Sequence, residues 1–224
     1  QIHQPKSDQL EQELCAYLAK YTQVIYPTVS AIHLLEVEAL MQRLSVDFDW
    51  TFLKPNKKLA EFKTLMRKAD PQADLAQRQY AIKEFLLQQI AQAAPTENPA
   101  LLKEQLRARE LRSATTMKSG VALPHTISSA VEKPALVAIA LDENIDWGGV
   151  FGPVSHIIAM LLPANPQPFH TSAFRALSLS FLNHKTGEFI CEHKTSEELH
   201  AILHCLMKVP KNPINHQPLS IKLS

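Results

Sequence analysis

Pro134-Ala-Leu-Val-Ala-Ile-Ala-Leu141 is apolar at almost every position. A strand with one face in water alternates apolar and polar side chains, whereas a strand covered on both faces can be apolar throughout. This stretch therefore predicts a central strand with a layer of helices on each side. The run His156–Leu162 is a second strand of similar character, and Val121–Leu123 is a shorter one.

Around these strands, apolar residues recur at helical spacing. We expect helices at residues 8–20, 29–44, 57–68, 75–94, 99–109, 172–182 and 196–207, and a short strand at residues 46–53. Strands interleaved with helices predict an α/β fold, a layered sandwich with a mixed central sheet flanked by helices. The helices before residue 69 predict a mainly helical N-terminal extension.

Prolines mark the boundaries, with Ala69-Asp70-Pro71 as the clearest one. Residues 1–68 are expected to form the helical extension, which would serve docking, dimerisation or autoinhibition. Residues 69–209 would form the layered domain. Residues 210–224 contain two further prolines and are expected to be an extended tail.

The composition of the 224 residues excludes several classes of function. A net charge of +1 predicts no nucleic-acid binding by a basic surface. No apolar run reaches the roughly 20 residues of a membrane span, and no signal-peptide pattern opens the chain. Three cysteines without a CxxC spacing predict free thiols in a reducing compartment, so we expect a cytoplasmic location without membrane insertion.

Gly120-Val-Ala-Leu-Pro-His125 contains the main candidate for chemistry. Pro124 cannot donate to a sheet, so the strand before it should end there. His125 would then lie in a loop beside the carboxyl edge of the sheet, where ligands bind in open α/β sheets. A neutral ring nitrogen near pH 7 makes histidine a suitable phosphoryl acceptor. An ordinary loop histidine is commoner, so the surrounding residues have to decide between the two.

The residues around His125 resemble those of a known protein family. Leu102–Glu110, Thr115 and Gly120–His125 together resemble the fructose, mannitol and nitrogen-regulatory class of enzyme IIA domains of the bacterial phosphotransferase system. In that family an Arg-Glu pair closes a helix, a threonine follows, and a G-[IV]-A-[IL]-P-H segment carries the phosphohistidine. Ile145-Asp-Trp147 and the strand ending at Pro163 are also similar, and the resemblance runs from about residue 75 to residue 207.

The resemblance implies that His125 accepts a phosphoryl group from a histidine-phosphocarrier protein. The group would then pass to a IIB component, or its presence would control a transporter or regulator, in sugar transport or nitrogen regulation. No cofactor is implied. Arg109 would neutralise phosphoryl oxygens, Thr115 would donate a hydroxyl hydrogen bond, and Gly120 would allow close approach or a positive φ. An ordinary helix-terminal cation and a turn residue are the alternatives for Arg109 and Thr115.

The sequence departs from the family at the second histidine, which assists phosphoryl transfer. Ala173 stands at its position and Phe174 replaces the leucine that follows. His170 is the accessory candidate if the helix starts early, and otherwise a loop residue. Thr126 follows the phosphohistidine position, where the family often has glycine. A non-catalytic regulatory interaction domain of a transporter or transcriptional regulator is therefore the alternative function, and a hydrolase using His125 as a base lacks a nucleophile motif.

Three further histidines have other expected roles. His200 and His204 have the i, i+4 spacing of metal ligands, but no carboxylate stands where it would complete a site. We therefore expect no metal site. His156 interrupts an apolar strand, which predicts a packed core histidine with hydrogen-bonded ring nitrogens.

Overall fold

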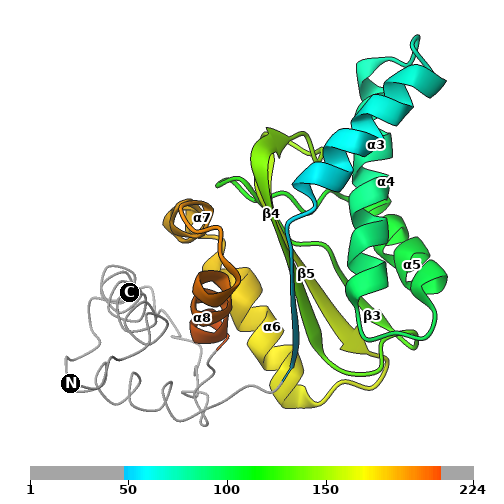
Figure 1. Ribbon diagram of the computed structural model, residues 1–224. Coiled ribbons are helices and arrows are strands. Elements are labelled where there is room, and N and C mark those ends of the chain that lie inside the picture. The colour runs from blue at the N-terminus through cyan, green and yellow to red at the C-terminus, as the bar shows by residue number, and fades with distance from the viewer. Residues whose placement is uncertain (1–47, 208–224) are drawn as a thin grey trace, which may run out of the picture.

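The computed structural model describes residues 48–207, which fold around one sheet with helices on both faces (Figure 1). The strands are β1 (Asp49–Leu53), β2 (Val121–Ala122), β3 (His125–Ser128), β4 (Ala135–Ile145) and β5 (Val154–Pro163). The helices are α3 (Asn56–Ala69), α4 (Leu75–Ala93), α5 (Pro99–Arg112), α6 (Pro168–Ser180), α7 (His184–Cys191) and α8 (Ser196–Leu206). Helices α3–α5 cover one face and α6–α8 the other, so the predicted α/β sandwich is confirmed.

The sheet has the order β1-β4-β5-β2, and β3 also pairs with β5. Strands β4 and β5 are antiparallel. The pairs β1–β4, β2–β5 and β3–β5 are parallel. The sheet is therefore mixed, with β1 along one edge and the two short strands β2 and β3 along the other.

Strand β4 explains the apolar run of the sequence. Every residue from 135 to 141 is fully buried. Leu136, Ala138 and Ala140 belong to the core under α6–α8, whereas Val137 and Ile139 belong to the core under α3–α5. Because successive side chains of a strand point to opposite faces, a strand inside two cores has no position for a polar residue.

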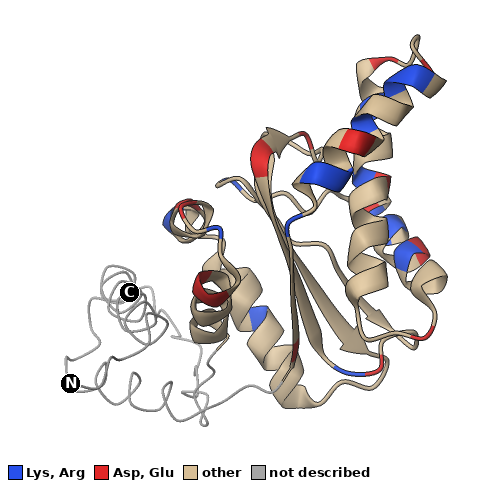
Figure 2. Ribbon diagram, viewed as in Figure 1, with Lys and Arg blue, Asp and Glu red and all other residues tan. Residues whose placement is uncertain are grey.

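The positions of the charged residues agree with this burial of the sheet. Figure 2 shows Lys, Arg, Asp and Glu mainly on the helices and on the ends of the strands, while the middle of the sheet carries almost none.

The helices begin at polar caps. Asp74 and Gln77 form a reciprocal capping box at α4, Asn98 caps α5 ahead of Pro99, and Thr195 caps α8.

Residues before 69 contribute to this same sheet. The short strand expected at residues 46–53 is present as β1, which pairs with β4 from Asp49 to Leu53. Leu59 of α3 is buried in the core of the α3–α5 face. Pro71 thus falls between two helices of one layer. The helices expected at residues 8–20 and 29–44 and the tail after residue 209 lie outside the described residues.

The sequence prediction differs from the structure at three elements. His125 does not lie in a loop but opens β3, because the Pro124 carbonyl accepts a hydrogen bond from Met160 N (2.9 Å) and keeps the chain beside β5. Helix α6 begins at Pro168 rather than at residue 172. Helix α7 was not expected from the sequence.

Two observations concern membrane-spanning helices and cysteines. None of the helices between residues 48 and 207 is both long enough and apolar enough to cross a membrane. Cys191 is a free thiol, as expected. Cys205 is disulfide-bonded, so the expectation of free thiols is wrong at that position.

Candidate functional site

His125 lies at the amino end of the edge strand β3, half-buried, with both ring nitrogens hydrogen-bonded. Nε2 accepts a hydrogen bond from Arg109 Nε at 3.1 Å. Nδ1 lies 2.9 Å from the carbonyl oxygen of Leu123. The structure therefore brings together His125 and Arg109, two residues that the sequence analysis had placed in one site.

These two contacts select one tautomer of the imidazole. A carbonyl oxygen can only accept, so Nδ1 carries the proton and donates it to Leu123. A guanidinium can only donate, so Nε2 holds a lone pair that points at Arg109. The two contacts fix the orientation of the ring from both sides and leave the lone pair of the imidazole on Nε2.

Arg109 is held by the end of its own helix. It lies in the last turn of α5, and its Nη1 donates to the carbonyl oxygen of Ser113 at 3.0 Å. Ser113 is the C-cap of α5, so this carbonyl has no partner within the helix. The guanidinium thus satisfies a helix terminus with one nitrogen and reaches His125 with another. Arg109 therefore has the helix-terminal role considered for it, and the same side chain also contacts His125.

Both donors of Thr115 bind the side chain of Glu110. Its hydroxyl donates to a carboxylate oxygen of Glu110, and its backbone N–H also donates to Glu110, at 3.3 Å. The physical reason is that the Glu110 side chain is 2% exposed and a buried carboxylate requires donors. The sequence analysis did not select Glu110, although it follows Arg109 directly.

Gly120 has the positive φ that was considered for it, +79°. Its carbonyl oxygen accepts from Ser155 N at 3.0 Å and from His156 N at 3.3 Å. A Cβ at this position would lie 3.4 Å from the Cys191 sulfur. The glycine lets the chain turn from the loop after α5 into β2 while staying close to β5.

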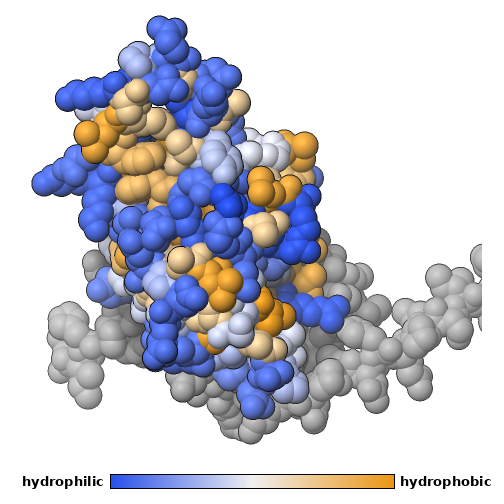
Figure 3. All heavy atoms as spheres, turned by 90° about the vertical axis from the view of Figure 1, so that its right-hand side faces the viewer, coloured by the Kyte–Doolittle hydropathy of each residue, from blue (hydrophilic) through white to orange (hydrophobic). Residues whose placement is uncertain are grey.

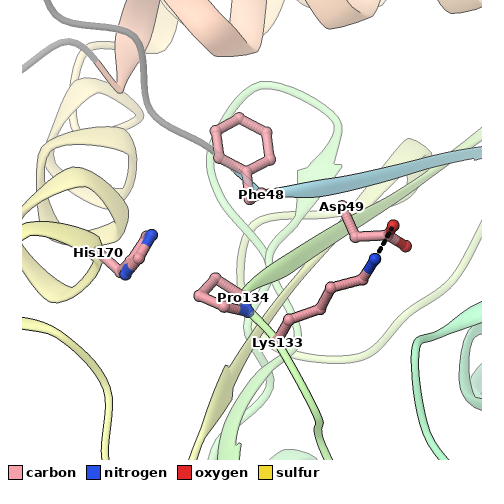
Figure 4. Close-up of a pocket in the computed structure, with 5 residues that line it drawn as sticks. All are labelled: Phe48, Asp49, Lys133, Pro134 and His170. Atoms are coloured by element: carbon pink, nitrogen blue, oxygen red, sulfur yellow. Dashed lines mark ion pairs between the residues drawn. The ribbon is translucent and has the colours of Figure 1, made fainter.

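His170 lies in the first turn of α6, so it is a helix residue. It lines a pocket of about 310 Å³ together with Phe48, Pro134 and the ion pair of Lys133 with Asp49, which measures 3.1 Å (Figure 4). His125 is not among the residues that line this pocket.

Ala173, one turn along α6, is fully buried in the core of the α6–α8 face.

His156 is the core histidine that its sequence position predicted. It is fully buried, its Nε2 lies 2.7 Å from the His193 carbonyl oxygen, and its Nδ1 lies 2.8 Å from the Ser155 hydroxyl. Burial lowers the pKa of this imidazole, and the bond to the His193 carbonyl only partly opposes that effect. The ring is therefore neutral in the folded protein.

This burial predicts a loss of stability in mild acid. A histidine whose pKa is lower in the folded state than in the unfolded state stabilises the fold fully above the unfolded pKa of about 6.5, and this contribution is lost as the pH falls below it. We expect His156 to lower the unfolding free energy between pH 7 and pH 5.5, by at most about 1 kcal/mol. Urea unfolding of wild type, His156→Asn and the exposed control His184→Asn would measure it. An equal pH dependence in all three proteins would contradict the assignment.

His200 and His204 stack with ring centroids 5.9 Å apart on α8, and Trp50 of β1 packs edge-on against His200. Burial lowers the pKa of both imidazoles. Between residues 48 and 207, no group of three histidine, cysteine or carboxylate side chains is placed to hold a metal ion. These rings act as packing between the edge strand β1 and α8.

The fold and the site together define a class of protein, an α/β sandwich that presents a neutral, arginine-bound histidine on an edge strand. The sequence model of the phosphoenolpyruvate-dependent sugar phosphotransferase system EIIA 2 family matches residues 69–205. The chain belongs to this family.

Several known proteins are similar over part of the chain. The multiphosphoryl transfer protein of Shigella flexneri is 30% identical over 110 residues, which cover 49% of this chain and only 13% of that protein. The fructose-specific EIIA component of Haloferax volcanii is 26% identical, covering 54% of this chain and 79% of its own length. The nitrogen regulatory protein of Pseudomonas aeruginosa is 26% identical, covering 54% and 82%.

Among solved structures, the nitrogen regulatory protein IIA-Ntr of Neisseria meningitidis is 22% identical with a TM-score of 0.45. The match covers 74% of this chain and 99% of that one.

Proposed function

We propose that this protein is a phosphocarrier that accepts a phosphoryl group on His125 Nε2 from a histidine-phosphocarrier protein. It then passes the group to a IIB component or uses its phosphorylation state to control a partner. The observation that carries the proposal is the pair of hydrogen bonds on His125, from Arg109 to Nε2 and from Nδ1 to the Leu123 carbonyl. Together they supply a neutral, oriented nucleophile beside a cation.

The transfer step is a displacement at phosphorus. The lone pair of His125 Nε2 attacks the phosphorus of the donor's phosphohistidine, and a new N–P bond forms. The bond from phosphorus to the donor nitrogen breaks, and its electron pair returns to the donor ring. The proton on Nδ1 stays in place, and its hydrogen bond to Leu123 stabilises the positive charge that the His125 ring gains.

Arg109 has to change partner during this step. In the unphosphorylated protein its Nε–H occupies the lone pair that must attack. A guanidinium has five N–H donors, so it can release Nε2 and bind the incoming phosphoryl oxygens, which carry the negative charge. Its second contact, to the Ser113 carbonyl, holds the group near the site while this exchange occurs.

A partner protein needs an apolar surface around the histidine, because its own phosphohistidine must come within reacting distance. Ile127 lies two residues after His125 on β3 and is 58% exposed. Figure 3 shows the face that carries α3–α5, where apolar patches lie between hydrophilic side chains. We propose that the Ile127 side chain contacts the carrier.

The destination of the phosphoryl group is part of the proposal. The relatives include a fructose-specific EIIA component and a nitrogen regulatory protein, so both transport and regulation fall within the family. Ala173 at the second-histidine position favours regulatory output over rapid sugar-linked transfer. The exchange would take place in the cytoplasm, and residues 1–68 would serve docking or dimerisation.

The test is direct phosphorylation of the full chain. The protein is incubated with phosphoenolpyruvate, enzyme I and the histidine-phosphocarrier protein, and intact mass reports incorporation. We expect one added phosphoryl group that is labile in acid and stable in base, as a phosphohistidine is. A chain that takes up no phosphoryl group over hours would overturn the proposal and favour a non-catalytic interaction domain.

A further inference from the structure

We propose that Glu110 is a positioning residue that sets the tautomer and orientation of His125 through the segment from Ser113 to Thr115. This inference rests on the proposed phosphoryl transfer at His125 and extends it to a buried residue that does not touch the reacting atoms.

Glu110 binds donors from three other parts of the chain. One oxygen accepts from the Thr115 hydroxyl. The other accepts from Thr115 N at 3.3 Å and from the indole Nε1 of Trp147 at 3.0 Å, and it forms an ion pair with Lys83 Nζ at 3.2 Å. Lys83 belongs to α4 and Trp147 follows β4, so this one side chain joins segments that are far apart in sequence.

The segment that Glu110 holds provides both supports of the His125 ring. On one side, the Ser113 carbonyl anchors Arg109, whose Nε donates to Nε2. On the other side, the Thr115 carbonyl accepts from Leu123 N at 3.1 Å, and the carbonyl of the same leucine accepts from His125 Nδ1. A displacement of residues 113–115 would therefore disturb both hydrogen bonds of the imidazole at once.

The charge of Glu110 matters as well as its shape. The side chain is 2% exposed, so water cannot replace a lost donor. Lys83 lies over the Trp147 ring, 5.1 Å from its centroid, which keeps the ammonium at the carboxylate. A buried carboxylate with one cation and three neutral donors is satisfied only while all four groups converge, so it favours a single arrangement of the segment.

Glu110→Gln tests the charge with almost no change of shape. The amide oxygen of glutamine can still accept from Thr115 N and Trp147 Nε1, but a neutral amide forms no ion pair with Lys83. Its NH2 group replaces the carboxylate oxygen that accepts from the Thr115 hydroxyl. Thr115→Val is the second variant, which removes the hydroxyl and keeps the backbone. We expect both variants to be phosphorylated about tenfold more slowly, because small displacements of reacting groups are costly.

The second measurement is the tautomer of His125 in the unphosphorylated protein, read from its ring ¹⁵N chemical shifts. We expect the wild type to have the proton on Nδ1 and both variants to contain a mixture of tautomers. A merely structural role for Glu110 would lower the unfolding free energy without changing this signal.

Glu84→Gln is the matched control. Glu84 forms an ion pair with Lys103 at 3.2 Å, which also joins α4 to α5, but it is not linked to residues 113–115. It should leave the tautomer and the rate as in wild type. The inference is overturned if Glu110→Gln and Thr115→Val keep the wild-type tautomer, or if Glu84→Gln changes it equally. A wild type that accepts no phosphoryl group would defeat the proposed function, while the tautomer comparison would still decide the role of Glu110.

Discussion

His125→Ala should abolish phosphoryl incorporation, the largest effect expected of any single substitution in this protein. The variant removes the nitrogen that forms the bond to phosphorus, and the half-buried site on an edge strand should tolerate the smaller side chain. Intact mass after incubation with phosphoenolpyruvate, enzyme I and the carrier protein measures the loss. Circular dichroism should show an unchanged fold.

His170→Ala is the control for this variant, because His170 lies on α6 and its pocket does not include His125. We expect its rate to equal that of the wild type. Incorporation that persists in His125→Ala would contradict the assignment of the acceptor. A slow His170→Ala variant would instead give this residue the accessory role that the sequence analysis considered.

Arg109→Met should slow phosphorylation about 100-fold, the size of effect found when a positioned donor to a developing charge is removed. The variant keeps an unbranched stem but leaves Nε2 without its donor and the phosphoryl oxygens without a cation. Single-turnover rates with the phosphorylated carrier protein would measure the change. Arg109→Lys should recover only part of the rate, since an ammonium cannot bind two oxygens as a fork.

Arg112→Met provides the matched control for this experiment. Arg112 lies on the same last turn of α5 and is exposed. Removal of its charge should change the rate only slightly, through the long-range attraction of an anionic phosphohistidine. Equal losses in the two variants would mean that Arg109 acts through net charge alone, against the role derived from its contact with His125.

The layers of the fold could be predicted because their signal is local. Strand β4 is apolar on both faces and α4 has a regular apolar stripe, so each element was found within a few residues of its observed bounds. Strand β3 was missed for a physical reason. Its four residues contain only one large apolar side chain, and its pairing depends on β5, more than 25 residues later. Pro124 indicated that the strand ends there. In the structure the pairing with β5 is only interrupted after β2 and resumes at β3.

The start of α6 could have been found. Pro168 occupies the first turn, a favoured place for proline in a helix, and this signal places His170 in the helix rather than in a loop. Helix α7 was harder to predict. It has only eight residues, one of them Gly187, and these are too few for a helical periodicity to be recognised. Sequence patterns predict such short elements poorly because tertiary packing stabilises them.

The functional site, like the fold, could be predicted from the sequence only in part. The pairing of Arg109 with His125 followed from the resemblance, since residues of known roles in a family keep their order along the chain. The role of Thr115 did not follow, because it depends on the buried carboxylate of Glu110. That carboxylate is completed by Lys83 and Trp147, whose convergence only the folded chain reveals.

Ala173 limits how the site can be redesigned. This position, which the sequence resemblance aligns with the second histidine, is fully buried and surrounded by a packed core. Insertion of a larger side chain into such a core forces its neighbours out of their preferred rotamers. A histidine engineered at residue 173 therefore requires smaller neighbours to be introduced at the same time.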